Sequence, residues 1–108
     1  MVLLHRDGCS ACWHLKSTFE KNNELQRLST NFVFINCNST EEPQGRGYAP
    51  DGDYVPRILF FASDGTPRPD IFNRLGKAEY QHYYVDAPSV VEAMREAAVT
   101  LRGSDAEL

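Results

Sequence analysis

The chain of 108 residues has the length of one domain, with 42% hydrophobic and 11% aromatic residues and a formal net charge of −4. These proportions provide enough apolar side chains for a core and exclude a disordered chain. No basic surface is available to neutralise phosphates, so we expect no nucleic-acid partner. The longest apolar runs, such as residues 58–62, are too short to span a bilayer, and we expect no membrane partner.

The beginning of the chain, from Met1, has no basic region and no cleavage site typical of a secretory signal. This pattern fits a cytosolic protein, and it equally fits a mature or truncated form of a secreted protein. The location of the protein therefore has to be argued from other features.

The first third of the chain predicts a strand, a helix and a second strand. Residues 2–5 form a short apolar run typical of a buried strand, and residues 32–35 are of the β-branched and aromatic kind. Between them, apolar side chains recur at helical spacing (Leu15, Phe19, Leu25 and Leu28). Asn22 and Asn23 predict a kink or break in this helix. Such a β-α-β unit makes the two strands parallel.

The middle of the chain predicts a long loop followed by a hairpin. Residues 38–54 are polar and rich in proline and glycine, and long loops of this kind are often functional. Residues 57–62 predict a third strand, and Asp64-Gly65 indicates a turn into a further strand at about residues 68–72. The hairpin would add antiparallel strands to the sheet.

The last helix has clear signals at both ends. Asp86 is a good N-cap and Pro88 suits the first turn, while Gly103 is typical of a C-cap. An apolar stripe lies between them (Val90, Met94, Ala97 and Leu101). We therefore predict one α/β domain over residues 1–103, in the order β-α-β, long loop, β-hairpin, α, with a tail over residues 104–108.

Cys9 and Cys12 form a C-x-x-C pair where the first predicted strand ends and the helix begins. The N-terminus of a helix presents unsatisfied N–H groups and a partial positive charge, which stabilise a thiolate and lower the pKa of Cys9. Cys9 would be the exposed nucleophile, and Cys12, one turn further in, the partner that resolves a mixed disulfide. This arrangement predicts thiol–disulfide exchange.

Two other roles for the pair remain open. A zinc site would need further ligands from His5, His14 or Cys37, and no second ligand pair with recognisable spacing exists. A redox-silent structural pair is the other alternative. We expect no metal and no cofactor.

Four residues near the pair are candidates for supporting roles. Pro56 opens the third predicted strand, and a cis Val55–Pro56 bond would leave the preceding backbone free to pair with an extended peptide; an ordinary trans proline is the alternative. His5 could stabilise the Cys9 thiolate or relay its proton; the alternative is that it only packs or makes a hydrogen bond. Arg57 is the best nearby cation for the thiolate, or it faces solvent or pairs with an acid.

Two further groups of side chains allow two interpretations each. Cys37, at the end of the second strand, is either a buried inert residue or a regulatory thiol. Four aromatic residues after the hairpin either form a peptide-binding patch or pack against the last helix (Phe72, Tyr80, Tyr83 and Tyr84).

The order of elements, the C-x-x-C and the strand-opening proline together resemble the thioredoxin fold. More narrowly, the chain resembles the small endoplasmic-reticulum family of thioredoxin domain-containing protein 12 and the anterior gradient proteins. The stretches that carry this resemblance are residues 9–12, 31–33, 41–43, 49–60, 83–85 and the C-terminal helix.

The resemblance implies a protein disulfide oxidoreductase of the reductase or isomerase type, coupled to glutathione. It assigns the nucleophile and resolving roles to Cys9 and Cys12, and substrate binding to Val55 and Pro56. The chain resembles the redox-active member of the family in having both cysteines, because the anterior gradient members keep only one. Disulfide-containing or dithiol client proteins and glutathione are the expected partners of a monomer. A client-binding or chaperone-like module with little redox turnover is the alternative.

The resemblance also implies the lumen of the endoplasmic reticulum. The terminal Asp-Ala-Glu-Leu of residues 105–108 resembles a Lys-Asp-Glu-Leu retrieval signal, and Asn38-Ser39-Thr40 is a glycosylation sequon.

The sequence departs from the family pattern in three ways. Gly8 stands where an aromatic residue usually precedes the first cysteine, with Trp13 following the second cysteine instead. Leu3 stands where thioredoxins bury an acid that moves the proton of the resolving thiol. The first strand and helix of a complete thioredoxin have no counterpart, which predicts an exposed sheet edge.

Overall fold

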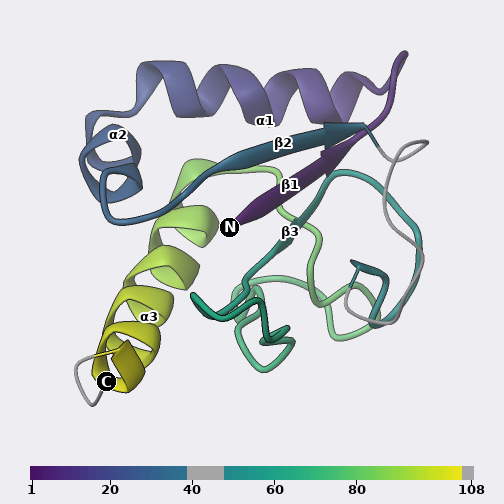
Figure 1. Ribbon diagram of the computed structural model, residues 1–108. Helices are drawn as coiled ribbons and strands as arrows, with labels where there is room; N and C mark the ends of the chain where they lie inside the picture. Colours follow the sequence, from purple (N-terminus) through teal and green to yellow (C-terminus); the bar gives the residue numbers. More distant parts are fainter. Residues whose placement is uncertain (39–47, 106–108) are drawn as a thin grey trace.

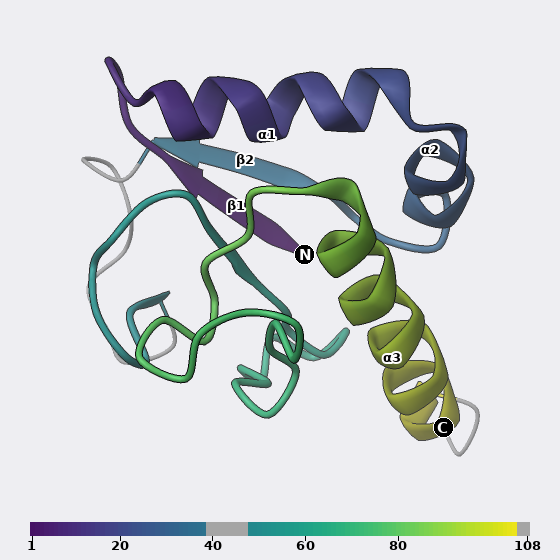
Figure 2. The same cartoon turned by 180° about the vertical axis from the view of Figure 1, so that it is seen from behind.

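The computed structural model of the chain describes residues 1–38 and 48–105. Its helices and strands are β1 (Val2–His5), α1 (Ser10–Lys21), α2 (Asn23–Ser29), β2 (Ile35–Asn38), β3 (Arg57–Leu59) and α3 (Ala87–Asp105). In both views, α1 lies on one side of the strands and the coil that links β3 to α3 lies on the other (Figures 1 and 2). None of the helices in the described part of the chain is long and apolar enough to cross a membrane.

The three strands form one sheet in the order β2-β1-β3. β2 is parallel to β1, with Val2 opposite Ile35, and β3 is antiparallel to β1, with Leu4 opposite Arg57. The predicted β-α-β unit is thus confirmed. β1 is buried between its two neighbours, which explains its unbroken run of apolar residues.

The two faces of the sheet pack against different parts of the chain. Leu3 and Ile58 point to the larger core, which they share with residues of all three helices, including Leu15, Leu25 and Met94. On the opposite face a smaller cluster contains Val2, Leu4 and Leu59, packed against Cys37, Tyr48 and Phe61. This alternation follows from the two-residue period of a strand.

The predicted break at the two asparagines is confirmed. Asn22 ends α1 by donating its N–H to Thr18 O at 3.0 Å and begins α2 by accepting the N–H of Leu25 on its side-chain oxygen at 3.0 Å. An asparagine side chain caps a helix well because its oxygen satisfies an otherwise unpaired N–H.

The second strand begins later than its sequence predicts. Residues 32–34 do not belong to β2, which starts at Ile35, opposite the first residue of β1. The rings of Phe32 and Phe34 pack instead edge to face on Phe60 and Phe19, at centroid distances of 6.0 and 5.4 Å. Their aromatic character therefore reflects packing rather than strand pairing.

The predicted hairpin is shorter than expected. The turn forms, with the N–H of Ala62 donating to Thr66 O at 2.9 Å, and Phe61 and Pro67 make an isolated bridge. No strand follows over residues 68–72 of the described chain. Pro67 and Pro69 have no N–H to donate, so a continuous ladder cannot form there.

The start of the last helix is confirmed, but its predicted end is wrong. Asp86 Oδ1 accepts the N–H of Ser89 at 3.0 Å, as expected of an N-cap. The helix continues to Asp105, with Gly103 inside it. A single glycine costs about 1 kcal/mol in a helix interior, which need not end the helix. Residues 106–108 lie outside the described residues.

Candidate active site

The cysteine pair lies where the chain turns from β1 into α1. Gly8 has a φ of 78°, in the left-handed region that glycine adopts without strain, and this allows the reversal after His5. Cys9 is the N-cap of α1, and it forms a disulfide with Cys12 across a Cα–Cα distance of 5.2 Å. The three residues before Cys9 are exposed.

The two cysteines differ in exposure and in their contacts. Cys9 is half-buried, whereas Cys12 is 4% exposed. Cys9 Sγ accepts the backbone N–H of Cys12 at 3.1 Å. An N–H group directed at Sγ stabilises a thiolate there. The arrangement gives Cys9 the features of an accessible nucleophile and Cys12 those of a shielded partner.

The side chains after the second cysteine point outward. Trp13 is 75% exposed, and His14 is also exposed on the surface of α1. The only tryptophan of the chain therefore follows the disulfide directly in sequence and is in contact with solvent.

His5 closes β1, just before the turn into α1 that carries Cys9 and Cys12, which we call the cysteine turn. Burial and the ammonium of Lys16 lower the pKa of His5, and the carboxylate of Asp7 opposes them. A histidine with a lowered pKa is mainly neutral near pH 7, since its usual value is about 6.5. This favours a role in moving a proton over a role as a fixed positive charge.

The Val55–Pro56 bond is cis, and Pro56 is buried directly before β3. Because β3 is antiparallel to β1 and Arg57 lies opposite Leu4, Pro56 is placed at the end of β1 that carries His5. The chain leaves this same end of β1 toward Cys9 (Figure 1). The two predicted parts of the site are thus brought to one end of the sheet.

Arg57 occupies a different environment from the one predicted. It does not face solvent, since it is 0% exposed, and its role as a cation beside the thiolate stays a prediction. Its Nη1 donates to Tyr54 O at 2.6 Å and its Nη2 to Tyr48 O at 2.9 Å. A buried guanidinium requires such bonds, because they replace its lost hydration. These bonds tie residues 48–55, which we call the segment before Pro56, to β3.

A second set of contacts around this segment was not predicted from the sequence. Tyr54 donates its hydroxyl to Asp51 Oδ1 at 2.5 Å and accepts the backbone N–H of His82 at 3.0 Å. Asp51 Oδ2 accepts the N–H of Gln81 at 2.8 Å. We call Asp51, Tyr54, Arg57 and His82 the Tyr54 cluster. The only signal of it in the sequence is that three of its members belong to the stretch of residues 49–60 that carried the resemblance.

Burial shifts the pKa values of two members of the Tyr54 cluster. Desolvation, followed by the hydrogen bond to Asp51, raises the pKa of Tyr54 well above its usual value, so its hydroxyl remains a donor. Desolvation lowers the pKa of His82, with Arg57 acting in the same direction and Asp51 against it. His82 is therefore neutral in the folded protein near pH 7.

Cys37 lies in β2, opposite Leu4, and is half-buried against the smaller apolar cluster. Its Sγ donates to Asn38 O at 3.5 Å. No group of three or more histidine, cysteine or acidic side chains that suits a metal occurs among the described residues. Ser39 and Thr40 of the sequon lie outside those residues, so glycosylation of Asn38 stays a prediction.

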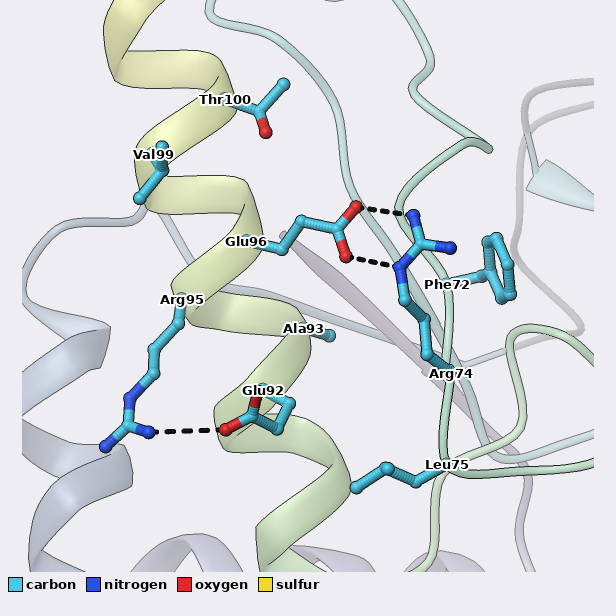
Figure 3. A pocket seen from close by; sticks show the side chains of 9 residues that line it. All are labelled: Phe72, Arg74, Leu75, Glu92, Ala93, Arg95, Glu96, Val99 and Thr100. Atoms are coloured by element: carbon cyan, nitrogen blue, oxygen red, sulfur yellow. Dashed lines mark hydrogen bonds and ion pairs between the residues drawn. The ribbon is translucent and has the colours of Figure 1, made fainter.

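The predicted aromatic patch is divided between three environments. Tyr80 and Tyr83 line a pocket of about 680 Å³, with the Tyr54 ring at centroid distances of 5.2 and 6.3 Å from theirs. Tyr84 is buried in the larger core. Phe72 lies beneath the Arg74 guanidinium at 4.3 Å, where Arg74 also pairs with Glu96 of α3 (Figure 3).

Comparison with known proteins identifies the family. Residues 1–63 match the family described as thioredoxin-like. Anterior gradient protein 3 of Mus musculus is 38% identical over 97 residues, which is 90% of this chain and 58% of that protein. The anterior gradient protein 2 homolog of Homo sapiens is 33% identical over 102 residues, 94% of this chain and 57% of that protein. The chain thus spans less than two thirds of the length of these relatives, and it belongs to the thioredoxin-like family.

Proposed function

We propose that this chain is a thiol–disulfide oxidoreductase that exchanges disulfides with client proteins through Cys9 and Cys12. The observation that carries the proposal is the bridge between the two cysteines in the first turn of α1, with the more exposed sulfur facing an N–H donor. The membership of the thioredoxin-like family supports it.

The reaction begins with the reduced pair. The Cys9 thiolate attacks one sulfur of a client disulfide, which forms a mixed disulfide and releases the other client sulfur as a thiolate. The Cys12 thiolate then attacks Cys9 Sγ, which releases the second client thiolate and leaves the Cys9–Cys12 disulfide. Two electrons pass from the protein to the client, and the client thiolates take up protons. The reverse sequence oxidises a dithiol client.

Two neighbouring features would assist these steps. Val55, directly before Pro56, would pair its backbone with an extended client segment and hold the disulfide against Cys9. Neutral His5 would accept the proton of a cysteine thiol, a function that Leu3 cannot perform.

The proposed setting is the secretory pathway, in the lumen of the endoplasmic reticulum. The anterior gradient relatives and the resemblance of the terminal Asp-Ala-Glu-Leu to a retrieval signal support this location. In that compartment glutathione would return the pair to its working state, and the chain would act as a monomer.

The test is the redox equilibrium of the pair in graded glutathione buffers, followed by alkylation and mass spectrometry. We expect a reversible two-electron transition between about −270 and −120 mV, the range of such proteins. Purified protein should also reduce a disulfide-bridged peptide, and Cys9→Ser should abolish this turnover.

Other outcomes would contradict the proposal. A pair that stays bridged or stays reduced across that range would exclude a role in exchange. Client binding that persists in Cys9→Ser without any turnover would favour a client-binding module instead.

A further inference from the structure

The segment before Pro56 is anchored at both of its ends by buried or partly buried hydrogen bonds. Arg57 holds the carbonyl groups of Tyr48 and Tyr54, while its carbon Cζ lies 5.9 Å from the centre of the Tyr54 ring. The guanidinium is therefore fixed by two acceptors and one aromatic ring. Residues 48 and 54 cannot move away from β3 without breaking these contacts.

The Tyr54 side chain provides an anchor in another direction. Its hydroxyl and the carboxylate of Asp51 bind the consecutive backbone N–H groups of His82 and Gln81. The carbonyl of His82 in turn accepts the N–H of Ile58 in β3 at 3.0 Å. The segment of residues 81–82 is thus bound to the loop on one side and to β3 on the other.

Val55 and Pro56 lie between the two anchored residues, Tyr54 and Arg57. Neighbouring Cα atoms are about 3.8 Å apart, so anchors on both sides leave little freedom to the two residues between them. A backbone that is already fixed loses less conformational entropy when it pairs with a client segment. This advantage exists only for clients that have a backbone to pair.

We infer that the Tyr54 cluster is a positioning device that holds the Val55 backbone ready for an extended polypeptide and so makes the site select polypeptide disulfides over disulfides without peptide groups. This inference rests on the proposed function and concerns its specificity. Tyr54, Asp51 and Arg57 act through Val55 and do not touch the reacting sulfurs.

The test compares two substrates in the Tyr54→Phe variant. This change removes the hydroxyl that joins Asp51 to the His82 N–H but keeps the ring against Arg57. The substrates are a disulfide-bridged peptide and 2-hydroxyethyl disulfide, which has no peptide group. We expect the ratio of kcat/KM for the peptide to kcat/KM for the small disulfide to fall roughly fivefold to tenfold, mainly through a higher KM for the peptide.

Tyr80→Phe is the matched control, because it removes the hydroxyl of a 49% exposed tyrosine whose ring packs on the Tyr54 ring. We expect it to leave the substrate ratio as in the wild type. Amide hydrogen exchange supplies a second readout: exchange at Gln81 and His82 should become faster in Tyr54→Phe and not in Tyr80→Phe.

Three results would overturn the inference. Equal losses of kcat/KM toward both substrates, which leave the ratio unchanged, would show a general structural role, and unchanged kcat/KM toward both would show that the cluster does not affect client binding. Unchanged exchange at both amides would show that the hydrogen bonds do not hold the segment. A wild type that reacts with neither disulfide would instead refute the proposed function, and the specificity inference with it.

Discussion

The cysteine turn and the segment before Pro56 lie at the same end of the sheet but are held in different ways. The cysteine turn depends on short-range contacts, such as the N–H of Cys9 to Arg6 O at 3.3 Å and the N–H of Cys12 to Cys9 Sγ at 3.1 Å. The hydrogen bonds of the Tyr54 cluster join residues far apart in the sequence: Tyr54 and His82 are 28 positions apart, and Asp51 and Gln81 are 30 positions apart. Under the proposed function, the cysteine turn would change its covalent state locally, whereas the segment before Pro56 would depend on the tertiary packing.

The largest expected effect comes from breaking the local part. In Cys12→Ser, Cys9 can still attack a client disulfide, but no second thiol releases the client. We expect the mixed disulfide to accumulate and turnover to fall at least about 100-fold, measured by mass spectrometry and by peptide reduction.

Cys37→Ser is the control for this experiment, because Cys37 belongs to β2 and not to the cysteine turn. It should trap no client and leave turnover near that of the wild type. A mixed disulfide with the client that forms only when Cys37 is present would contradict the assignment of the nucleophile to Cys9.

The next effect concerns stability and the long-range part. Arg57→Met leaves the carbonyls of Tyr48 and Tyr54 without their charged donor, which we expect to lower the free energy of unfolding by about 3 kcal/mol. Urea unfolding measures this change. Arg68→Met is the matched control, since Arg68 pairs with the exposed Asp70, and it should lower the free energy of unfolding far less than Arg57→Met does. Equal costs for the two variants would contradict the structural importance of Arg57.

The smallest effect is a dependence of stability on pH that arises in the Tyr54 cluster. The pKa of His82 is lower in the folded than in the unfolded protein, so below a pH of about 6.5 the unfolded chain binds the proton more readily. Stability should therefore fall from pH 7.5 to pH 5.5. In His82→Gln the free energy of unfolding should fall less between these two pH values, as measured by urea unfolding at pH 7.5 and pH 5.5.

His14→Gln is the control, because His14 is exposed on α1. It should keep the wild-type dependence on pH. A fall in stability that disappears in His14→Gln, or that persists in full in His82→Gln, would place the responsible group outside the Tyr54 cluster.

The elements that the sequence predicts well are those determined by near neighbours. The apolar run of β1, the break at Asn22 and the N-cap at Asp86 each depend on residues within one or two turns. The errors concern places where distant packing decides. Phe32 and Phe34 have strand-like character but pack as rings, and the helix passes through Gly103.

The same distinction applies to the site. Cys9 and Cys12 could be predicted because the spacing and the helix start are local features. The burial of Arg57 could not, since an arginine in a short strand is usually exposed and its acceptors, Tyr48 and Tyr54, lie outside that strand. The contact of Tyr54 with His82 depends on the path of the coil after β3, for which the sequence offered no pattern.

The position of Trp13 has an optical consequence. Its indole follows Cys12 directly, is 75% exposed and is the only one in the chain. A neighbouring disulfide quenches indole emission, so opening the Cys9–Cys12 bridge should brighten the protein while its other chromophores stay in place. We therefore expect the fluorescence of Trp13 to report the redox state of the Cys9–Cys12 pair without a label.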